Sequence, residues 1–274
     1  TGPVPLRAIG EHSAEIRRLA MTQDGGTAYS TSEDDTVRVW ESATGICTAV
    51  LHCNAGGTFA LDVTPDGRRC IVGGRDGSVI VWEPPDMTSV RRLRGHAAFV
   101  LDAALTPDGS WAVTCGDDGT VAGWDLTNCA KLYMRPVSDV ERVRSVAIMH
   151  DGNLVAVGCA PDSDARPVNQ LLRLMDGRTG APIRRLSTFT DFFYHVVFDR
   201  SGLRLLGSYF GGVSVSDLTQ PGDWRPRWSA TSGGRSDGER VGVSRTMPPR
   251  ADGCCLSGTA DGQVVLWHVD SGEE

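Results

Sequence analysis

The chain is poor in lysine and lacks the patterns that mark several common functions. Lysine occurs once, at Lys131, beside 26 arginines, and the formal net charge is −7. An acidic chain argues against a protein that wraps nucleic acid or lies on an anionic membrane surface. No apolar run reaches the length of about 18 residues that a membrane-spanning helix needs. We therefore expect neither a nucleic acid nor a membrane among its partners.

Motifs for cofactors and metals are missing as well. The eight cysteines include no CxxC pair and no Cys/His cluster with zinc spacing. No glycine-rich phosphate loop of the nucleotide-binding type occurs. The segment that contains Asp162 and Asp164 lacks the glycine and the distal glutamate of a calcium-binding loop. This favours a solvated insertion between two strands. The sequence predicts no cofactor and no metal.

Thr1 to Pro5 lack the basic and apolar regions of a signal peptide. The chain does not begin with Met, and we expect it to be a domain cut from a larger protein. Cysteines such as Cys70, Cys115 and Cys159 fall within apolar runs, where a thiol behaves as a small hydrophobe. Since disulfide scaffolds are typical of much shorter secreted chains, a reducing, cytoplasmic setting is expected.

A repeat runs through the whole chain. Trp40, Trp82 and Trp124 stand 42 residues apart, each at the end of a short apolar segment. The phrase Thr-Pro-Asp-Gly begins at Thr64 and again at Thr106, also 42 residues apart. Three more divergent copies place Met175, Ser216 and Trp267 where the tryptophan stands. The sequence therefore predicts six repeat units.

Each unit has the pattern of four short strands. In the third unit we expect strands over residues 100–105, 111–115, 120–124 and 130–134, separated by turn residues. Paired glycines, such as Gly73-Gly74, are also expected in turns. No helical stripe of useful length is present. The sequence thus predicts an all-β fold with one four-stranded antiparallel sheet in each unit.

Repeated sheets of this size can bury their faces only against their neighbours, which favours radial packing. We expect a six-bladed β-propeller in a single domain, residues 1–274. The expected blades span residues 12–51, 52–94, 95–135, 136–186, 187–229 and 230–270. Residues 5–10 resemble a fourth-strand segment, and their pairing into the last blade closes the ring and removes two open edges.

The chain resembles the WD-repeat (WD40) β-propeller family, in its bacterial type. The resemblance rests on Gly95-His96, Trp40-Glu41, Trp82-Glu83, Trp124-Asp125 and the Asp-Gly turns at Asp76, Asp118 and Asp261. It implies a hydrogen-bonded structural network of His, Asp, a hydroxyl residue and Trp in each regular blade. The implied networks are His12, Asp34, Ser30 and Trp40 in blade one, and His96, Asp118, Thr114 and Trp124 in blade three.

Other blades depart from this pattern. Blade two has Asn54 in the histidine position and Val72 in the hydroxyl position. A set of His, Ser and Asp also suggests a hydrolytic triad. However, the set occurs in two blades with the same spacing along the sequence, and in both its last member is a tryptophan. That repetition favours a structural network, so no catalytic residues are expected.

The resemblance also implies partner binding on the upper face, which is the end of the blades where each first strand begins. Aromatic and arginine side chains, which are typical of interface hot spots, occur there. The alternative is that some of them plug the central channel. The implied contact residues are Glu15, Arg17, Glu33, Phe59, Arg75, Phe99, Leu101, Asp117, Arg142, Arg144, Phe192, Tyr194, Tyr209 and Arg240.

These observations favour a non-catalytic scaffold or sensor module that binds a protein or peptide partner and regulates an attached effector domain. The partner is expected to be a separate protein or another domain of the same one, and the module itself to be monomeric. The alternative is a small-ligand-binding or enzymatic propeller that uses the channel mouth. The carboxylates Glu15, Glu33 and Asp117 stand near that mouth without a histidine beside them.

Overall fold

A computed structural model of the chain describes residues 12–83, 90–137, 142–160, 172–186, 193–199, 201–209, 212–219, 228–230, 243–246, 254–259 and 264–268. These residues form strands joined by turns and include no helix. A helix capable of crossing a bilayer is therefore absent from the described ranges. The all-β prediction is confirmed.

The described strands form six antiparallel sheets in chain order. The first sheet contains β1 (Ile16–Met21), β2 (Thr27–Ser32), β3 (Thr36–Glu41) and β4 (Ile46–His52). The second contains β5 (Thr58–Val63), β6 (Cys70–Gly74), β7 (Ser78–Trp82) and β8 (Val90–Arg94). The third contains β9 (Val100–Leu105), β10 (Trp111–Gly116), β11 (Thr120–Asp125) and β12 (Ala130–Pro136).

The last three sheets follow further along the chain. The fourth contains β13 (Arg142–Ile148), β14 (Leu154–Ala160), β15 (Leu172–Asp176) and β16 (Pro182–Leu186). The fifth contains β17 (Phe193–Phe198), β18 (Arg204–Tyr209), β19 (Gly212–Asp217) and β20 (Trp228–Ala230). The sixth shows β21 (Val243–Thr246), β22 (Cys254–Thr259) and β23 (Val264–His268) among the described residues. Residues 5–10 and the acidic insertion at 162–164 lie outside the described ranges.

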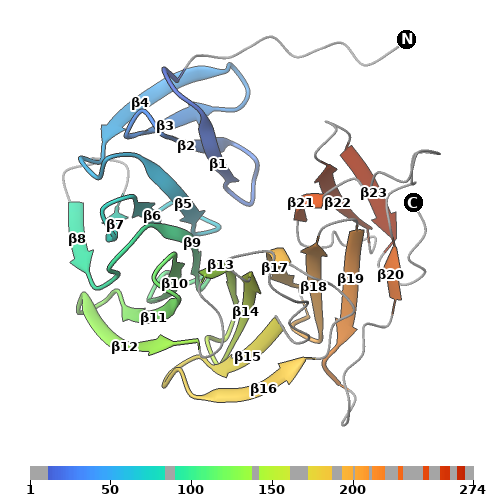
Figure 1. The fold of residues 1–274 in the computed structure, drawn as a ribbon. Coiled ribbons are helices and arrows are strands. Elements are labelled where there is room, and N and C mark those ends of the chain that lie inside the picture. Colours follow the sequence, from blue (N-terminus) through green and yellow to red (C-terminus); the bar gives the residue numbers. More distant parts are fainter. Residues whose placement is uncertain are drawn as a thin grey trace, which may run out of the picture.

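The sheets follow one another around a common centre, as in a propeller (Figure 1). The first strands β1, β5, β9, β13 and β17 lie on the inside, and consecutive first strands pack against each other. The fourth strands β4, β8, β12 and β16 form the outer rim. The sheets that contain β1 and β21 are the two ends of this arc. The arrangement therefore gathers the starts of the first strands around one centre.

The hydrophobic core lies between neighbouring sheets. Ile71 and Val79 of the second sheet pack in one cluster with Val100 and Ala112 of the third, and all four are fully buried. β-Branched side chains suit such pleated, two-sided packing. Each large aliphatic side chain removed from water contributes about 1.5–3 kcal/mol. Because these apolar side chains are buried between sheets, each repeat is stabilised by its contacts with the neighbouring repeats.

The strand predictions for the third unit are accurate to one or two residues. Strand β9 has the expected bounds, and β10, β11 and β12 end at Gly116, Asp125 and Pro136, slightly beyond them. The turn prediction also holds at Gly67 and Gly109, whose φ angles are 71° and 67°. The repeat spacing and the turn residues therefore predicted the positions of strands β9 to β12.

Gly73 and Gly74, which were expected in a turn, are the last two residues of β6, directly before the turn at Asp76-Gly77. A Cβ atom on Gly73 would lie 2.5 Å from Cγ1 of Val100 in the next sheet. That distance is shorter than any normal carbon–carbon contact. The glycine is thus required by the close approach of two sheets and not by a turn.

Candidate functional site

Every first strand breaks its regular pairing with the second strand near its upper end. In β1, Ile16 pairs with Ser32 and Arg18 with Thr31, so Arg17 is left out of the ladder. A bulge of this kind bends the strand and redirects the side chain of the extra residue. Equivalent shifts in the other first strands leave out Phe59, Leu101, Arg144, Tyr194 and Ser244.

Bulge residues of five sheets line one cavity of about 180 Å³, which we call the bulge cavity. They are Arg17, Phe59, Leu101, Arg144 and Tyr194. The cavity is completed by Arg18 and His195, which directly follow two of the bulge residues. Its volume is several times the roughly 30 Å³ share of one water molecule, but below the roughly 300–1,000 Å³ of typical small-molecule sites.

Beside the bulge cavity lies a cluster of two phenylalanines, two arginines and a glutamate, which we call the arginine–phenylalanine cluster. The rings of Phe59 and Phe99 stack with centroids 5.4 Å apart. The guanidinium of Arg75 lies 5.4 Å and 5.1 Å from these two centroids, and that of Arg17 lies 5.3 Å from Phe59. These distances are typical of cation–π contacts. Glu33 accepts a hydrogen bond from Arg17 Nε at 2.8 Å and lies 3.8 Å from Arg75.

The other two acidic residues that were predicted as contacts, Glu15 and Asp117, are also paired with arginines. Arg17 Nη1 lies 3.1 Å from the Glu15 carboxylate, and Arg142 Nε lies 3.2 Å from that of Asp117. The backbone N–H of Asp117 donates to the carbonyl of Phe99 at 2.9 Å, which holds the two loops together. The predicted contact residues of blades one to four thus lie on one face.

The predictions for blades five and six are only partly covered. Phe192 and Arg240 lie outside the described residues, and Tyr209 ends β18 opposite Phe193. At the bulge position of the sixth sheet stands Ser244, which the sequence reasoning missed. The signal was available, because Ser244 follows Tyr194 by 50 residues, close to the length of the last repeat.

A buried polar connection crosses several first strands. Arg18 of β1 donates from Nη2 to the carbonyl of Leu101 in β9 at 3.1 Å, and its Nε lies 3.9 Å from Asp102. Asp102 is buried and accepts a hydrogen bond from Ser145 of β13 at 2.7 Å. Ser145 in turn accepts one from the N–H of Val196 in β17 at 3.1 Å. Arg18, which was not among the predicted contact residues, therefore connects the first strands β1 and β9.

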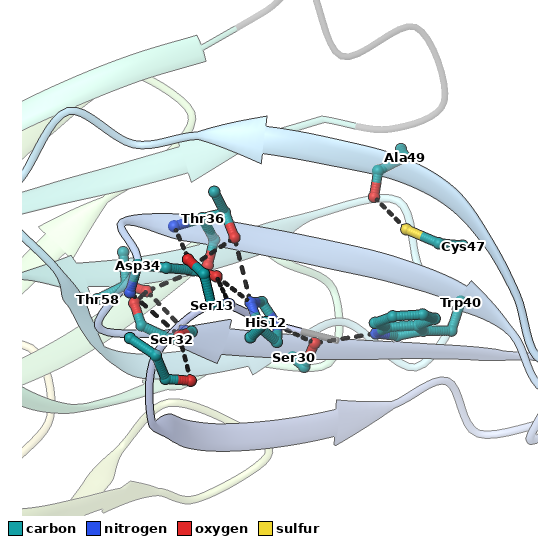
Figure 2. A network of polar contacts seen from close by, with 11 residues as sticks. His12, Ser13, Ser30, Ser32, Asp34, Thr36, Trp40, Cys47, Ala49 and Thr58 are labelled. Carbon is teal, nitrogen blue, oxygen red and sulfur yellow. Dashed lines mark hydrogen bonds and ion pairs between the residues drawn. The ribbon is translucent and has the colours of Figure 1, made fainter. Parts of the chain in front are cut away.

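In the first sheet, His12, Asp34, Ser30 and Trp40 form a chain of hydrogen bonds (Figure 2). The two ring nitrogens of His12 lie 2.9 Å from Asp34 and 2.7 Å from Ser30. Trp40 Nε1 donates to the same Ser30 hydroxyl at 2.9 Å. Burial raises the pKa of Asp34, but hydrogen bonds from Thr36, the Ser13 N–H and His12 outweigh it and hold this pKa well below its usual range.

The third sheet repeats this geometry. His96 lies 3.0 Å from Asp118 and 2.8 Å from Thr114, and Trp124 Nε1 donates to Thr114 at 2.8 Å. Burial raises the pKa of Asp118, but hydrogen bonds from His96 and the Ala97 N–H outweigh it and keep this pKa well below its usual range. The hydroxyl residue Thr114 is fully buried and cannot meet a substrate, which is incompatible with a nucleophile.

The second sheet uses an arginine where the histidine is missing. Arg92 of β8 donates to Ser78 at 2.7 Å, contacts Asp76 at 3.3 Å and also binds the carbonyl of Cys53. Among the described residues, Trp82 Nε1 finds no hydrogen-bond partner, because Val72 stands in the hydroxyl position.

The described part of the chain holds no group of three or more His, Cys, Asp or Glu side chains placed to bind a metal ion. The arginines, aromatic rings and paired carboxylates of the upper face are suited to non-covalent contacts.

Antiparallel four-stranded sheets that repeat along the chain, with a His–Asp–hydroxyl–Trp network in the regular copies, define a propeller-type repeat protein. Residues 3–41, 45–83 and 87–125 each match the family described as WD domain, G-beta repeat, so these three parts of the chain are WD repeats. WD40 repeats generally mediate protein–protein interactions and act as non-catalytic scaffolds. A search of curated proteins found no match to the chain.

Proposed function

We propose that the chain is a non-catalytic interaction module that binds a protein or peptide partner across the bulge cavity and the arginine–phenylalanine cluster. The observation that carries this proposal is the repeated bulge, which directs one side chain from each of five sheets into a single cavity. Propeller packing does not require arginine, phenylalanine and tyrosine at these positions, whereas interface hot spots are enriched in arginine and aromatic residues.

The size of the cavity supports a macromolecular partner over a free small ligand. A cavity of about 180 Å³ accommodates a side chain, but it lies below the range of sites that enclose whole metabolites. The neighbouring cluster extends the surface outward, since the Arg75 side chain is 47% exposed. A partner that inserts one side chain and covers the cluster uses both features.

A closed six-bladed ring is part of the proposal, and the family match supports it. The second and third matches begin at residues 45 and 87, just before the fourth strands β4 and β8 of the preceding sheets. The first match begins at residue 3, so the segment before β1 occupies the same place in its repeat. We propose that this segment supplies the fourth strand of the sixth sheet.

The exposure of β1 supports the same closure. Leu19 is 68% exposed, whereas Leu61, at the same register in the second sheet, is 2% exposed because the first sheet covers it. Met21 is likewise 56% exposed, against 9% for Val63. A ring in which the sixth sheet packs against β1 buries these side chains, as a closed propeller requires.

Capture of partners from a lysate of the source cell tests the proposed function. The wild type is compared with a double variant, Arg75→Glu with Tyr194→Ala, and with Arg68→Glu as a control. Arg68 is 86% exposed in the turn between β5 and β6, at the opposite end of the sheet. We expect a protein that the wild type and the control retain and the double variant loses. Equal retention by all three proteins, or by none, contradicts the proposal.

Regulation of an attached effector domain, a monomeric state and a cytoplasmic setting stay predictions from the sequence. Capture of an effector domain of the same protein would support the first of them.

A further inference from the structure

The arginines around the bulge cavity differ in how their charge is balanced. Arg17 is paired with Glu15 and Glu33. Arg18 donates to the carbonyls of Arg17 and Leu101 and lies near Asp102. Arg17 therefore has two carboxylate partners, whereas Arg18 donates from both terminal nitrogens to backbone carbonyls and its buried Nε has no hydrogen-bond partner among the described residues.

Arg144 is different. It lies at the bulge of β13, is partly buried and lines the bulge cavity. Within the described ranges, no hydrogen bond or ion pair engages its guanidinium group. A partly desolvated cation without a counter-ion is unfavourable, so an incoming anion gains more there than at an arginine that is already paired.

The charge available favours a monoanion. One unengaged guanidinium matches one carboxylate, and the planar fork of arginine binds a carboxylate through two parallel hydrogen bonds. A phosphate dianion calls for a second unengaged cation, and the other two arginines of the cavity already have acceptors. The net charge of −7 opposes acidic ligands at long range, so the attraction has to come from this local site.

The other walls suit the rest of an acidic side chain. Tyr194, at the bulge of the neighbouring strand β17, brings a hydroxyl that has no hydrogen-bond partner within the described residues. Phe59 and Leu101 supply apolar surface for methylene groups. The cavity of about 180 Å³ can enclose one side chain.

We infer that the bulge cavity is a socket for the carboxylate of an aspartate or glutamate of the partner, with Arg144 as its counter-ion. This inference rests on the proposed function and adds the chemistry of the contact. Arg144 binds the carboxylate, and Tyr194 donates a further hydrogen bond to it.

Blocked peptides test the socket. One peptide carries a single glutamate within a Gly/Ser segment, the second has glutamine in its place, and the third has phosphoserine. Binding of each to the whole chain is measured by NMR titration for the wild type, Arg144→Gln, Arg144→Lys and Arg94→Gln. Arg94 is an exposed residue of β8 outside the cavity, so its change to Gln is the matched loss of one charge.

The glutamate peptide is expected to bind the wild type and Arg94→Gln at least about tenfold more tightly than the glutamine peptide. Arg144→Gln should abolish this preference, and Arg144→Lys should retain part of it. Equal binding of both peptides to the wild type, including no binding of either, overturns the socket, as does a preference that persists in Arg144→Gln. Binding of the phosphoserine peptide more than about tenfold tighter than the glutamate peptide overturns the carboxylate assignment. If partner capture depends on Arg75 and Tyr194 while the peptides are not distinguished, only the socket fails.

Discussion

The Ser145 hydroxyl donates a hydrogen bond to Asp102 across the boundary between the third and fourth sheets, with an oxygen–oxygen distance of 2.7 Å. Both side chains are buried, at 0% and 2% exposure. Ser201 donates to Asp199 at the same distance, but within an exposed turn. The two pairs therefore separate the contribution of a buried contact between sheets from that of a surface contact.

Removal of the inter-sheet hydroxyl should destabilise the fold. Ser145→Ala leaves the Asp102 carboxylate with fewer donors and the Val196 N–H without its acceptor, so we expect a loss of about 2–3 kcal/mol in the free energy of unfolding. Ser201→Ala should cost less than about 0.5 kcal/mol. Urea unfolding of the two variants measures both values. Similar losses in the two would show that the connection between first strands contributes little.

Because the pKa values of Asp34 and Asp118 are low in the folded protein, the free energy of unfolding should depend on pH. Their folded pKa values lie below the ordinary value of 3.8, so the unfolded chain takes up protons first as the pH falls. The stabilisation is complete above about pH 5 and is lost as the pH falls below about 4. Asp118→Asn should be less stable than the wild type at pH 7 and lose less stability between pH 5 and pH 3.

Urea midpoints measured over this pH range check that prediction, with Asp151→Asn as a control in an exposed turn. The control should follow the wild type. An Asp118→Asn curve parallel to the wild type would contradict the role of the network in acid stability.

The unpartnered indole of Trp82 predicts an unusual response at Val72. Replacing a buried valine by threonine normally destabilises a core, because the new hydroxyl loses its water. At Val72, which matches Ser30 and Thr114 in register, the hydroxyl can accept from Trp82 Nε1. We therefore expect Val72→Thr to cost at least about 1 kcal/mol less than Val113→Thr. Both positions are fully buried, and equal losses in urea unfolding would rule out this explanation.

If the ring is closed, truncation of Leu19, which the described sheets leave exposed, should strongly lower the free energy of unfolding. Leu61→Ala should cost about 2–5 kcal/mol because Leu61 is buried between sheets, whereas Leu132→Ala on the outer rim should cost little. If the sixth sheet packs on β1, Leu19→Ala should lower the free energy of unfolding by about as much as Leu61→Ala does, as measured by urea unfolding. If it resembles Leu132→Ala, the ring is open at this place.

Much of the architecture could be predicted because its determinants are local. The spacing of Trp40, Trp82 and Trp124, and the turns that contain Gly67 and Gly109, indicated strands to within one or two residues. Five predicted upper-face positions are bulge residues that line one cavity. They could be predicted because the bulge occurs at the same position in each repeat.

What could not be predicted depends on distant residues. Gly73 looked like a turn glycine, although its role comes from Val100 of the next sheet. Arg92 replaces a histidine from a different strand, and only the pairing of β7 with β8 brings it near Asp76. Arg18 was missed because its contacts with Leu101 and Asp102 cross more than 80 residues of sequence. Such contacts leave no periodic signal.

The central claim is that the partner covers the ring of bulge residues, and amide hydrogen exchange tests it most directly. Exchange is measured on the whole chain alone and with the captured partner. Protection is predicted in segments 15–18, 57–59, 99–101, 142–144 and 193–195, which surround the bulge cavity. Protection confined to the opposite end, at turns 64–69 and 106–111, or to the outer strands β4, β8 and β12 would contradict the claim.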